Sequence, residues 1–134
     1  MKKYLTAVAV SLIALSCTTT SGIPKKITNQ PVLTGTEWQL ADQVKGTVPT
    51  IVFEDQKIRG NAGCNRYFGN VTLDPVNGGF STSNLGSTKM ACQNMETEAN
   101  FLSMLPKANK YRVSGNTLEL FDNQLLLLKF QKTK

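Results

Sequence analysis

The residues most suggestive of chemistry lie in one glycine-rich stretch, GNAGCNRYFGN, at positions 60–70. In this stretch Cys64 stands among three glycines and three asparagines, and Arg66 and two aromatic residues follow it. A nucleophilic thiolate, a metal ligand, a base-stacking platform and a disulfide-bonded turn could each have this composition. The rest of the sequence has to distinguish between them.

The chain contains no histidine, and this weakens the readings of the stretch as a nucleophile or a metal site. A catalytic cysteine or serine usually passes its proton to an imidazole, and catalytic zinc sites nearly always include a histidine. A histidine-free hydrolase would instead need two converging carboxylates, but the nine acidic residues fall mostly at expected strand ends, turns and a helix start. We therefore expect no catalytic residue, no metal, no cofactor and no enzymatic activity.

The N-terminus has the layout of a bacterial export signal. In MKKYLTAVAVSLIALSC, two lysines precede an apolar run over positions 4–15, and Ser16 and Cys17 follow. We interpret residues 1–16 as a lipoprotein signal peptide and Cys17 as the lipidated first residue of the mature chain. Residues 14–16 depart from the commonest lipobox, so the alternative is an ordinary signal peptide followed by a chance cysteine.

The next segment separates this anchor from the domain. Residues 17–33 are rich in threonine, serine, proline and lysine, with few large apolar side chains, and are expected to form a flexible tether. The folded domain is expected over residues 34–134. Thr18 occupies the position where an aspartate would, in enteric bacteria, retain a lipoprotein in the inner membrane. We therefore expect a lipid-anchored envelope protein on the periplasmic face of the outer membrane.

The charge of the mature chain is modest. Removal of Lys2 and Lys3 from the 15 basic residues leaves 13 against 9 acidic ones, a net charge of +4. These basic residues are scattered through the domain, whereas nucleic-acid-binding proteins gather them on one stripe or helix. We expect no nucleic-acid partner, and this removes the base-stacking reading of residues 60–70.

The odd number of cysteines is explained by the expected compartment. Cys17 is assigned to the lipid, which leaves Cys64 and Cys92 to pair in an oxidising envelope. The alternative is two buried reduced thiols. By the chain-entropy relation, a bridge around the 27 intervening residues contributes about 3–4 kcal/mol to stability.

The pattern of the domain is that of short strands broken by turns. We expect strands over residues 36–42, 50–55, 66–74, 80–84, 110–115, 117–122 and 124–130, and a hairpin turn at Asn77 and Gly78. Trp38 is expected in the core, and the leucines at 125–128 are expected to be covered on both faces of their strand. The fold class is therefore mainly β (α+β), a small, partly open antiparallel β-barrel of about seven or eight strands with one helix packed on it.

The one expected helix begins at Asn94 as its N-cap and ends at Pro106. Acidic residues occupy its first turn. Its apolar stripe is formed by Met95, Ala99, Phe101, Leu102 and Leu105.

Several motifs together carry a family resemblance. They are Trp38 with Leu40, GNAGCNRYFGN, STKMAC at 87–92, Glu98 with Phe101 and Leu105, and a closing LELF and LLLLKF. In this combination the chain resembles the META domain family, which includes the HslJ-like bacterial lipoproteins, from about Gly35 to Phe130. The resemblance implies a small, mainly β barrel tethered in the envelope, a link to stress and antibiotic tolerance, and no enzymatic reaction.

Two interpretations of function follow. The first is a noncatalytic, lipid-anchored and monomeric envelope protein, held on the membrane through Cys17, that binds another envelope protein in envelope maintenance or stress tolerance. The alternative is a lipocalin-like carrier or sensor of a small apolar ligand or acyl chain. Residues 60–70 are read mainly as a structural turn, with Asn65, Arg66 and Tyr67 as a candidate recognition surface.

Overall fold

The computed structural model describes residues 27–134; Cys17, the expected signal peptide and the first part of the expected tether lie outside these residues. The strands are β1 (Glu37–Leu40), β2 (Thr50–Glu54), β3 (Lys57–Asn61), β4 (Arg66–Asp74), β5 (Gly79–Ser87), β6 (Lys110–Ser114), β7 (Thr117–Asp122) and β8 (Leu125–Lys132). Between β5 and β6 lie helix α1 (Glu96–Met104) and the single 3₁₀ turn η1 (Leu105–Lys107).

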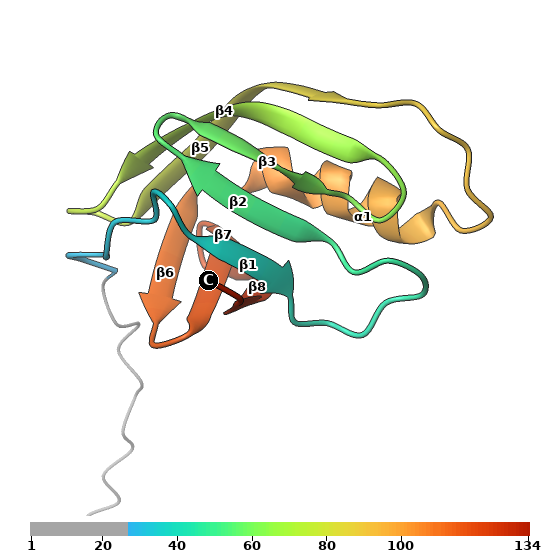
Figure 1. Cartoon of the computed structure of the whole chain (residues 1–134). Coiled ribbons are helices and arrows are strands. Elements are labelled where there is room, and N and C mark those ends of the chain that lie inside the picture. Colours follow the sequence, from blue (N-terminus) through green and yellow to red (C-terminus); the bar gives the residue numbers. More distant parts are fainter. Residues whose placement is uncertain (1–26) are drawn as a thin grey trace, which may run out of the picture.

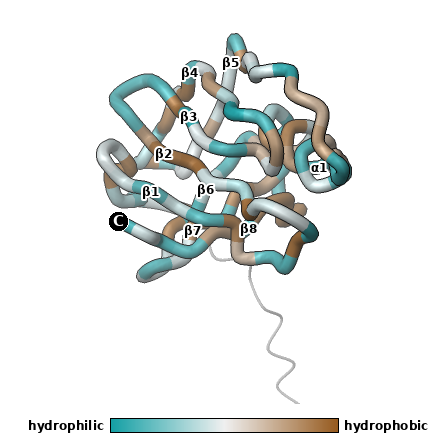
Figure 2. The backbone as a smooth tube through the Cα atoms, turned by 45° about the vertical axis from the view of Figure 1, so that its right-hand side comes forward, coloured by the Kyte–Doolittle hydropathy of each residue, from teal (hydrophilic) through white to brown (hydrophobic). Residues whose placement is uncertain are grey.

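The strands pair antiparallel in sequence order, and β8 returns to pair with β1, so that the sheet closes into an eight-stranded barrel (Figure 1). Helix α1 lies at one side of this ring of strands (Figure 2). The predicted fold class, a small antiparallel barrel with one helix packed on it, is confirmed.

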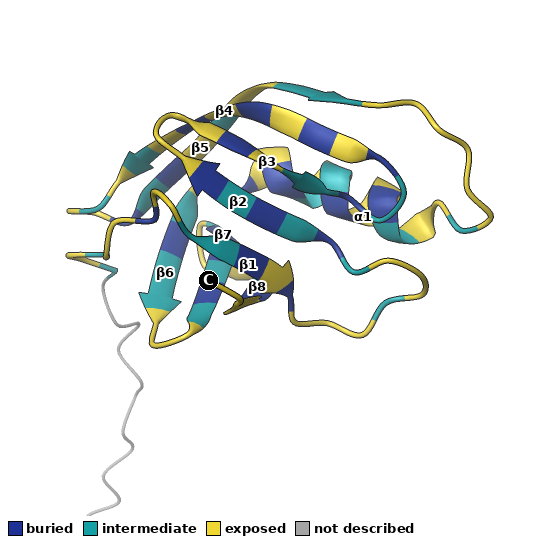
Figure 3. Cartoon of the chain, in the orientation of Figure 1, coloured by how far each residue is buried: buried dark blue, intermediate teal, exposed yellow. Residues whose placement is uncertain are grey.

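Alternation of side chains places the apolar residues inside. In β2 the side chains of Ile51 and Phe53 are buried, and the residues beside them are more exposed. In β4 the buried Tyr67 alternates with Phe68, which points outward and is 59% exposed. Figure 3 shows this banding, in which buried positions alternate with intermediate ones along β2 and with exposed ones along β4. Trp38 is buried, as predicted.

Aromatic side chains form much of the core. The ring of Phe101 on α1 lies 5.3 Å from that of Tyr67 and 6.3 Å from that of Phe130, between centroids. These distances and the inclined ring planes suit favourable aromatic contacts. Helix α1 is therefore held on the barrel by a side chain that enters the core shared by β4 and β8.

The junction between β5 and β6 is narrow. The two strands are in register only at Gly79 and Lys110. On either side of that pair, the Phe80 amide donates to the Asn109 carbonyl at 3.0 Å, and the Tyr111 amide donates to the Gly78 carbonyl at 2.8 Å. Beyond Phe80, β5 leaves β6 and packs against η1. The ring of strands, expected to be partly open, therefore closes at this point through one short seam.

The expected flexible tether is wrong for its last residues. Leu33 is buried, and the Gln30 amide donates to the Pro75 carbonyl at 2.7 Å. The side-chain oxygen of Gln30 accepts the Val113 amide at 2.6 Å, in the place that a neighbouring strand's carbonyl would take. A polar composition concealed this role, because one leucine and one glutamine suffice to attach the segment to the domain.

Two further expectations about local structure are corrected. Helix α1 is preceded by Met95 without a side-chain cap, and the Asn94 side chain accepts only a long 3.4 Å bond from the Glu96 amide. Leu125 and Leu126 are 65% and 45% exposed, although the leucine run was expected to be covered on both faces. They lie at the start of β8, beside the turn from β7, and residues 27–134 leave them accessible to solvent.

Candidate functional site

The cysteine at the centre of the glycine-rich stretch is bonded to Cys92, as expected from the cysteine count, with 6.1 Å between the two Cα atoms. The bridge joins the β3–β4 connection to the loop that precedes α1. A cysteine in a disulfide has no thiolate, so Cys64 is not a nucleophile in this oxidised form.

Asn65, the next residue, uses all four hydrogen-bonding positions of its side-chain amide. Its Nδ2 donates to the Met90 carbonyl at 3.0 Å and to Glu98 Oε1 at 2.8 Å. Its Oδ1 accepts from Thr88 Oγ1 at 2.8 Å and from the Met90 amide at 2.6 Å. The side chain, which is 1% exposed, therefore attaches the loop before α1 to both the barrel and the helix.

Glu98 is the buried charge of this cluster, at 6% exposure. Its Oε2 accepts the backbone amides of Cys64 at 3.0 Å and Asn65 at 2.5 Å. Burial raises the pKa of Glu98, but the hydrogen bonds from Asn65 and Cys64 lower it by more, so the pKa lies below its ordinary value. The carboxylate is thus ionised near neutral pH, and its oxygens are already occupied by the turn.

Sequence reasoning did not assign this role to Glu98, although a signal was present. Glu98 stands at the i, i+3, i+4 and i+7 spacing with Phe101, Leu102 and Leu105, which places a carboxylate on the apolar face of the helix. A charged residue on a buried face requires compensating partners. The amides of the 63–65 turn supply them, since Gly63 packs directly against the backbone at Glu98.

The predicted recognition surface of Asn65, Arg66 and Tyr67 is wrong for two of its residues. Asn65 is the buried connector described above, and Tyr67 is 1% exposed. The Tyr67 hydroxyl donates to the Thr50 carbonyl at 2.9 Å, and burial raises its pKa. Only Arg66 is exposed, because successive residues of a strand point to opposite faces. The cluster around Cys64 is therefore structural.

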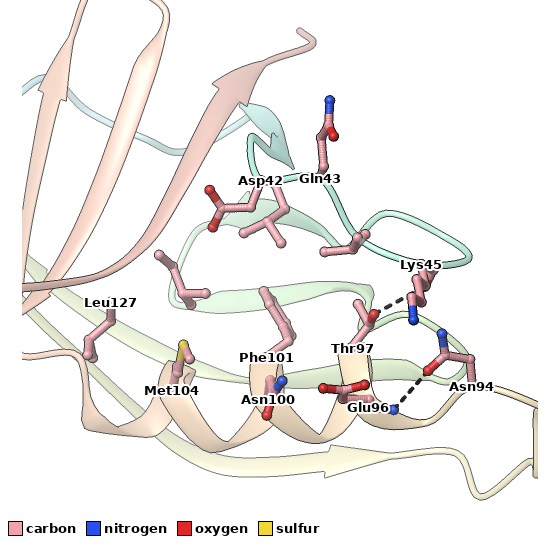
Figure 4. A pocket seen from close by; sticks show the side chains of 13 residues that line it. Asp42, Gln43, Lys45, Asn94, Glu96, Thr97, Asn100, Phe101, Met104 and Leu127 are labelled. Atoms are coloured by element: carbon pink, nitrogen blue, oxygen red, sulfur yellow. Dashed lines mark hydrogen bonds between the residues drawn. The ribbon is translucent and has the colours of Figure 1, made fainter.

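A better candidate for binding is a groove on the surface beside α1 (Figure 4). One wall is the β1–β2 loop at residues 41–46, the other is α1 along its length together with Asn94 just before it, and β8 closes one end. Its volume is about 370 Å³, toward the lower end of the range of about 300–1,000 Å³ for ligand pockets. The apolar lining consists of Leu40, Val44, Phe101, Met104, Leu127 and Leu128.

Polar side chains surround this apolar lining. They are Asp42, Gln43, Lys45, Asn94, Glu96, Thr97 and Asn100. The Thr97 hydroxyl donates to the Lys45 carbonyl at 3.1 Å, which attaches the loop to the helix at one end of the groove. No sequence signal could have identified the groove, because three segments far apart in the chain form it.

The side chains that line the groove limit the contacts it can make with a ligand. Among residues 27–134, no group of three or more histidine, cysteine or acidic side chains is placed to hold a metal ion. The same residues include no helix that is long and apolar enough to cross a bilayer. The groove offers hydrophobic contact, hydrogen bonds and two carboxylates, at Asp42 and Glu96.

Comparison with known proteins gave one family and two structures. The family model described as META domain matches residues 31–134. The chain is similar to an NMR structure of a protein from Burkholderia xenovorans, with 22% identity and a TM-score of 0.63, covering 100% of this chain and 99% of that one. A second NMR structure is 23% identical with a TM-score of 0.58, covering 74% of this chain and 90% of that one. At these identities the two structures support the fold alone. No curated protein matches significantly.

Proposed function

The chain belongs to the META domain family, and on that premise we propose that it is a noncatalytic, lipid-anchored protein of the bacterial envelope that acts by binding another envelope protein. Cys17 would carry the lipid, and the partner would be a protein of envelope maintenance or stress tolerance.

The observation that carries this proposal is the way the interior of the barrel is filled. Large side chains occupy it, and the largest that are fully buried are Trp38, Tyr67, Tyr111, Phe53, Phe101 and Phe130. The one buried carboxylate that is described, Glu98, is engaged by the turn beside it. A barrel packed in this way offers its outer surface for function.

The same packing speaks against the alternative of a lipocalin-like carrier. An acyl chain inside the barrel would have to displace aromatic side chains that lie in contact with one another. The groove beside α1 and a second one along β2, β3 and β4 both lie open on the outside of the barrel. We therefore do not extend the proposal to an internal ligand.

The proposed anchor rests on the N-terminal sequence, where lysines, an apolar run and Cys17 follow one another. Stable membrane attachment generally requires two acyl chains or an equivalent pair of signals. We expect the Cys17→Ser variant to lose metabolic labelling with a fatty acid and to leave the membrane fraction. Retention of both properties by this variant would remove the anchor from the proposal.

Binding to an envelope protein is tested by crosslinking in living cells. A photoreactive amino acid is placed in turn at exposed positions over the surface. They include Asn100, which lines the groove, and Lys57 at the start of β3, which does not. We expect a discrete crosslinked protein from one region and none from the others. The absence of any protein adduct from every position, at normal expression and export, would overturn the proposal.

A further inference from the structure

We infer that the groove between α1, the 41–46 loop and β8 binds an amphipathic segment of a partner protein, with apolar side chains on one face and basic side chains beside them. This inference rests on the proposed function and names the chemistry of the partner.

The apolar requirement comes from side chains that the fold leaves partly uncovered. Val44, Met104 and Leu127 are only partly buried, and all three line the groove. In the same strand, Leu126 and Leu125 directly precede Leu127 and are 45% and 65% exposed. Apolar surface with a polar rim is characteristic of protein interaction sites. A partner that removes these side chains from water gains the hydrophobic contribution that the monomer does not realise.

The shape of the groove favours a single segment over a broad flat surface. A volume of about 370 Å³ accommodates a few side chains. The apolar lining lies between two polar walls, an arrangement that suits an amphipathic helix with anchors on one face. Because the Thr97 hydroxyl holds the loop to the helix, and Phe101 belongs to the core, the groove is formed before anything binds.

The basic requirement comes from the charges on the two walls. Asp42 lies on the loop wall and Glu96 on the helix wall, and the one basic residue among the lining side chains is Lys45. Residues 27–134 contain two ion pairs, Arg59 with Glu54 and Arg112 with Glu119, and neither involves these carboxylates. The lining thus carries two carboxylates against one lysine, a net charge of −1, on a chain whose net charge is positive. Basic side chains beside an apolar face complement it, and an acidic partner would be repelled.

The test uses the full-length protein, expressed with its own N-terminus and reconstituted in zwitterionic nanodiscs. The probe is a synthetic leucine and lysine peptide of about 18 residues, or five helical turns, with leucines on one face and a photoreactive group among them. An acidic twin carries glutamate in place of every lysine. Empty nanodiscs measure adsorption of each peptide to lipid.

We expect the basic peptide to bind about tenfold more tightly than its acidic twin and to crosslink to Val44, Met104 or Leu127. The double variant Asp42→Lys, Glu96→Lys should bind the basic peptide about three- to tenfold more weakly than the native protein does and should bind the acidic peptide more tightly. Asp55→Lys, which reverses an exposed acid in the β2–β3 turn, is the matched control and should leave both affinities unchanged. Unchanged unfolding midpoints verify that the variants fold.

Equal binding of the two peptides, crosslinks that map outside the groove, or insensitivity to the double charge reversal would each overturn the inference. Photo-crosslinking of two copies of the chain through the groove in the absence of peptide would overturn it as well, and would assign the groove to self-association. These failures are distinguishable from failure of the proposed function. If the proposed function fails, crosslinking in cells gives no protein adduct at any surface position. If a partner is captured in cells and its capture is unchanged by the two charge reversals, only the inference about the groove fails.

Discussion

Replacement of Glu98 by glutamine tests the central claim about the Cys64 cluster, that a buried carboxylate holds the turn to the helix. The substitution keeps the shape of the side chain but removes its charge. If the remaining oxygen stays on the amides of Cys64 and Asn65, the new NH₂ group faces Asn65 Nδ2, which is itself a donor. Asn65 cannot simply turn over, because its Oδ1 is already bonded to Thr88 and Met90.

The magnitude follows from these three bonds. A hydrogen bond to a charged group contributes about 1.5–3 kcal/mol and a neutral one about 0.5–1.5, so neutralising the acceptor of two amides costs about 2 kcal/mol. Loss of the third bond, to an Asn65 Nδ2 that still reaches Met90, adds about 1 kcal/mol. We therefore expect Glu98→Gln to lower the free energy of unfolding by about 3 kcal/mol, or the melting temperature by about 10–20 °C.

The assay is urea unfolding without reductant, followed by the fluorescence of Trp38, which is the only tryptophan and is 2% exposed. Glu96→Gln is the matched control, because it removes an exposed carboxylate from the same turn of the helix. It should change the free energy of unfolding by less than about 0.5 kcal/mol. The reasoning is refuted if Glu98→Gln unfolds at the same urea concentration as the Glu96 variant.

The pH dependence has a defined sign. The pKa of Glu98 is lowered in the folded state, so its contribution is fully present above the ordinary glutamate pKa of about 4.3 and is lost as the pH falls toward the lower folded value. The native protein should therefore lose stability more steeply below about pH 5 than the Glu98→Gln variant does. Parallel stability curves for the two proteins between pH 6 and pH 3 would contradict the assignment.

Three other predictions concern stability and are measured by the same unfolding assay. The double variant Cys64→Ser, Cys92→Ser should lose about 3–4 kcal/mol and match the reduced native protein, and a loss below about 1 kcal/mol would show that the bridge does not constrain the unfolded chain. Tyr67→Phe should cost about 0.5–1.5 kcal/mol because its hydroxyl donates to the Thr50 carbonyl. Tyr111→Phe should be neutral or stabilising, because within residues 27–134 its buried hydroxyl has no hydrogen-bond partner; the reverse order would contradict the hydrogen-bond assignment. Gln30→Ala should cost about 1 kcal/mol, because it leaves the Val113 amide without its acceptor. The control Gln56→Ala, in an exposed turn, should leave the free energy of unfolding unchanged. Equal values for the two variants would mean that residues 28–33 belong to the tether, as the sequence predicted.

Much of the barrel could be predicted from the sequence because strand periodicity is a local property. Alternation around Ile51 and Phe53, the Asn77–Gly78 turn and the three final strands are each encoded within a few residues, and the structure confirms them. The Cys64–Cys92 pairing also followed from the sequence, since the compartment and the odd cysteine count left only two candidates. The anchor at Cys17 stays a prediction from the same kind of local signal.

The candidate site could not be predicted, because it depends on which segments meet. Composition marked residues 17–33 as a tether, but Gln30 completes the edge of β6 only because β6 lies beside that segment. The sequence of residues 65–67 is compatible with an exposed recognition surface. In the folded protein, however, the side chains of Asn65 and Tyr67 are buried, and Glu98 from α1 bonds to Asn65. The groove likewise exists only where the 41–46 loop, α1 and β8 converge. The sequence by itself determined the strands, the turns and the cysteine pair, since local residue patterns and the cysteine count indicate them. The tertiary structure alone decided which polar groups are buried together and which apolar side chains remain exposed, because that depends on contacts between residues far apart in the chain.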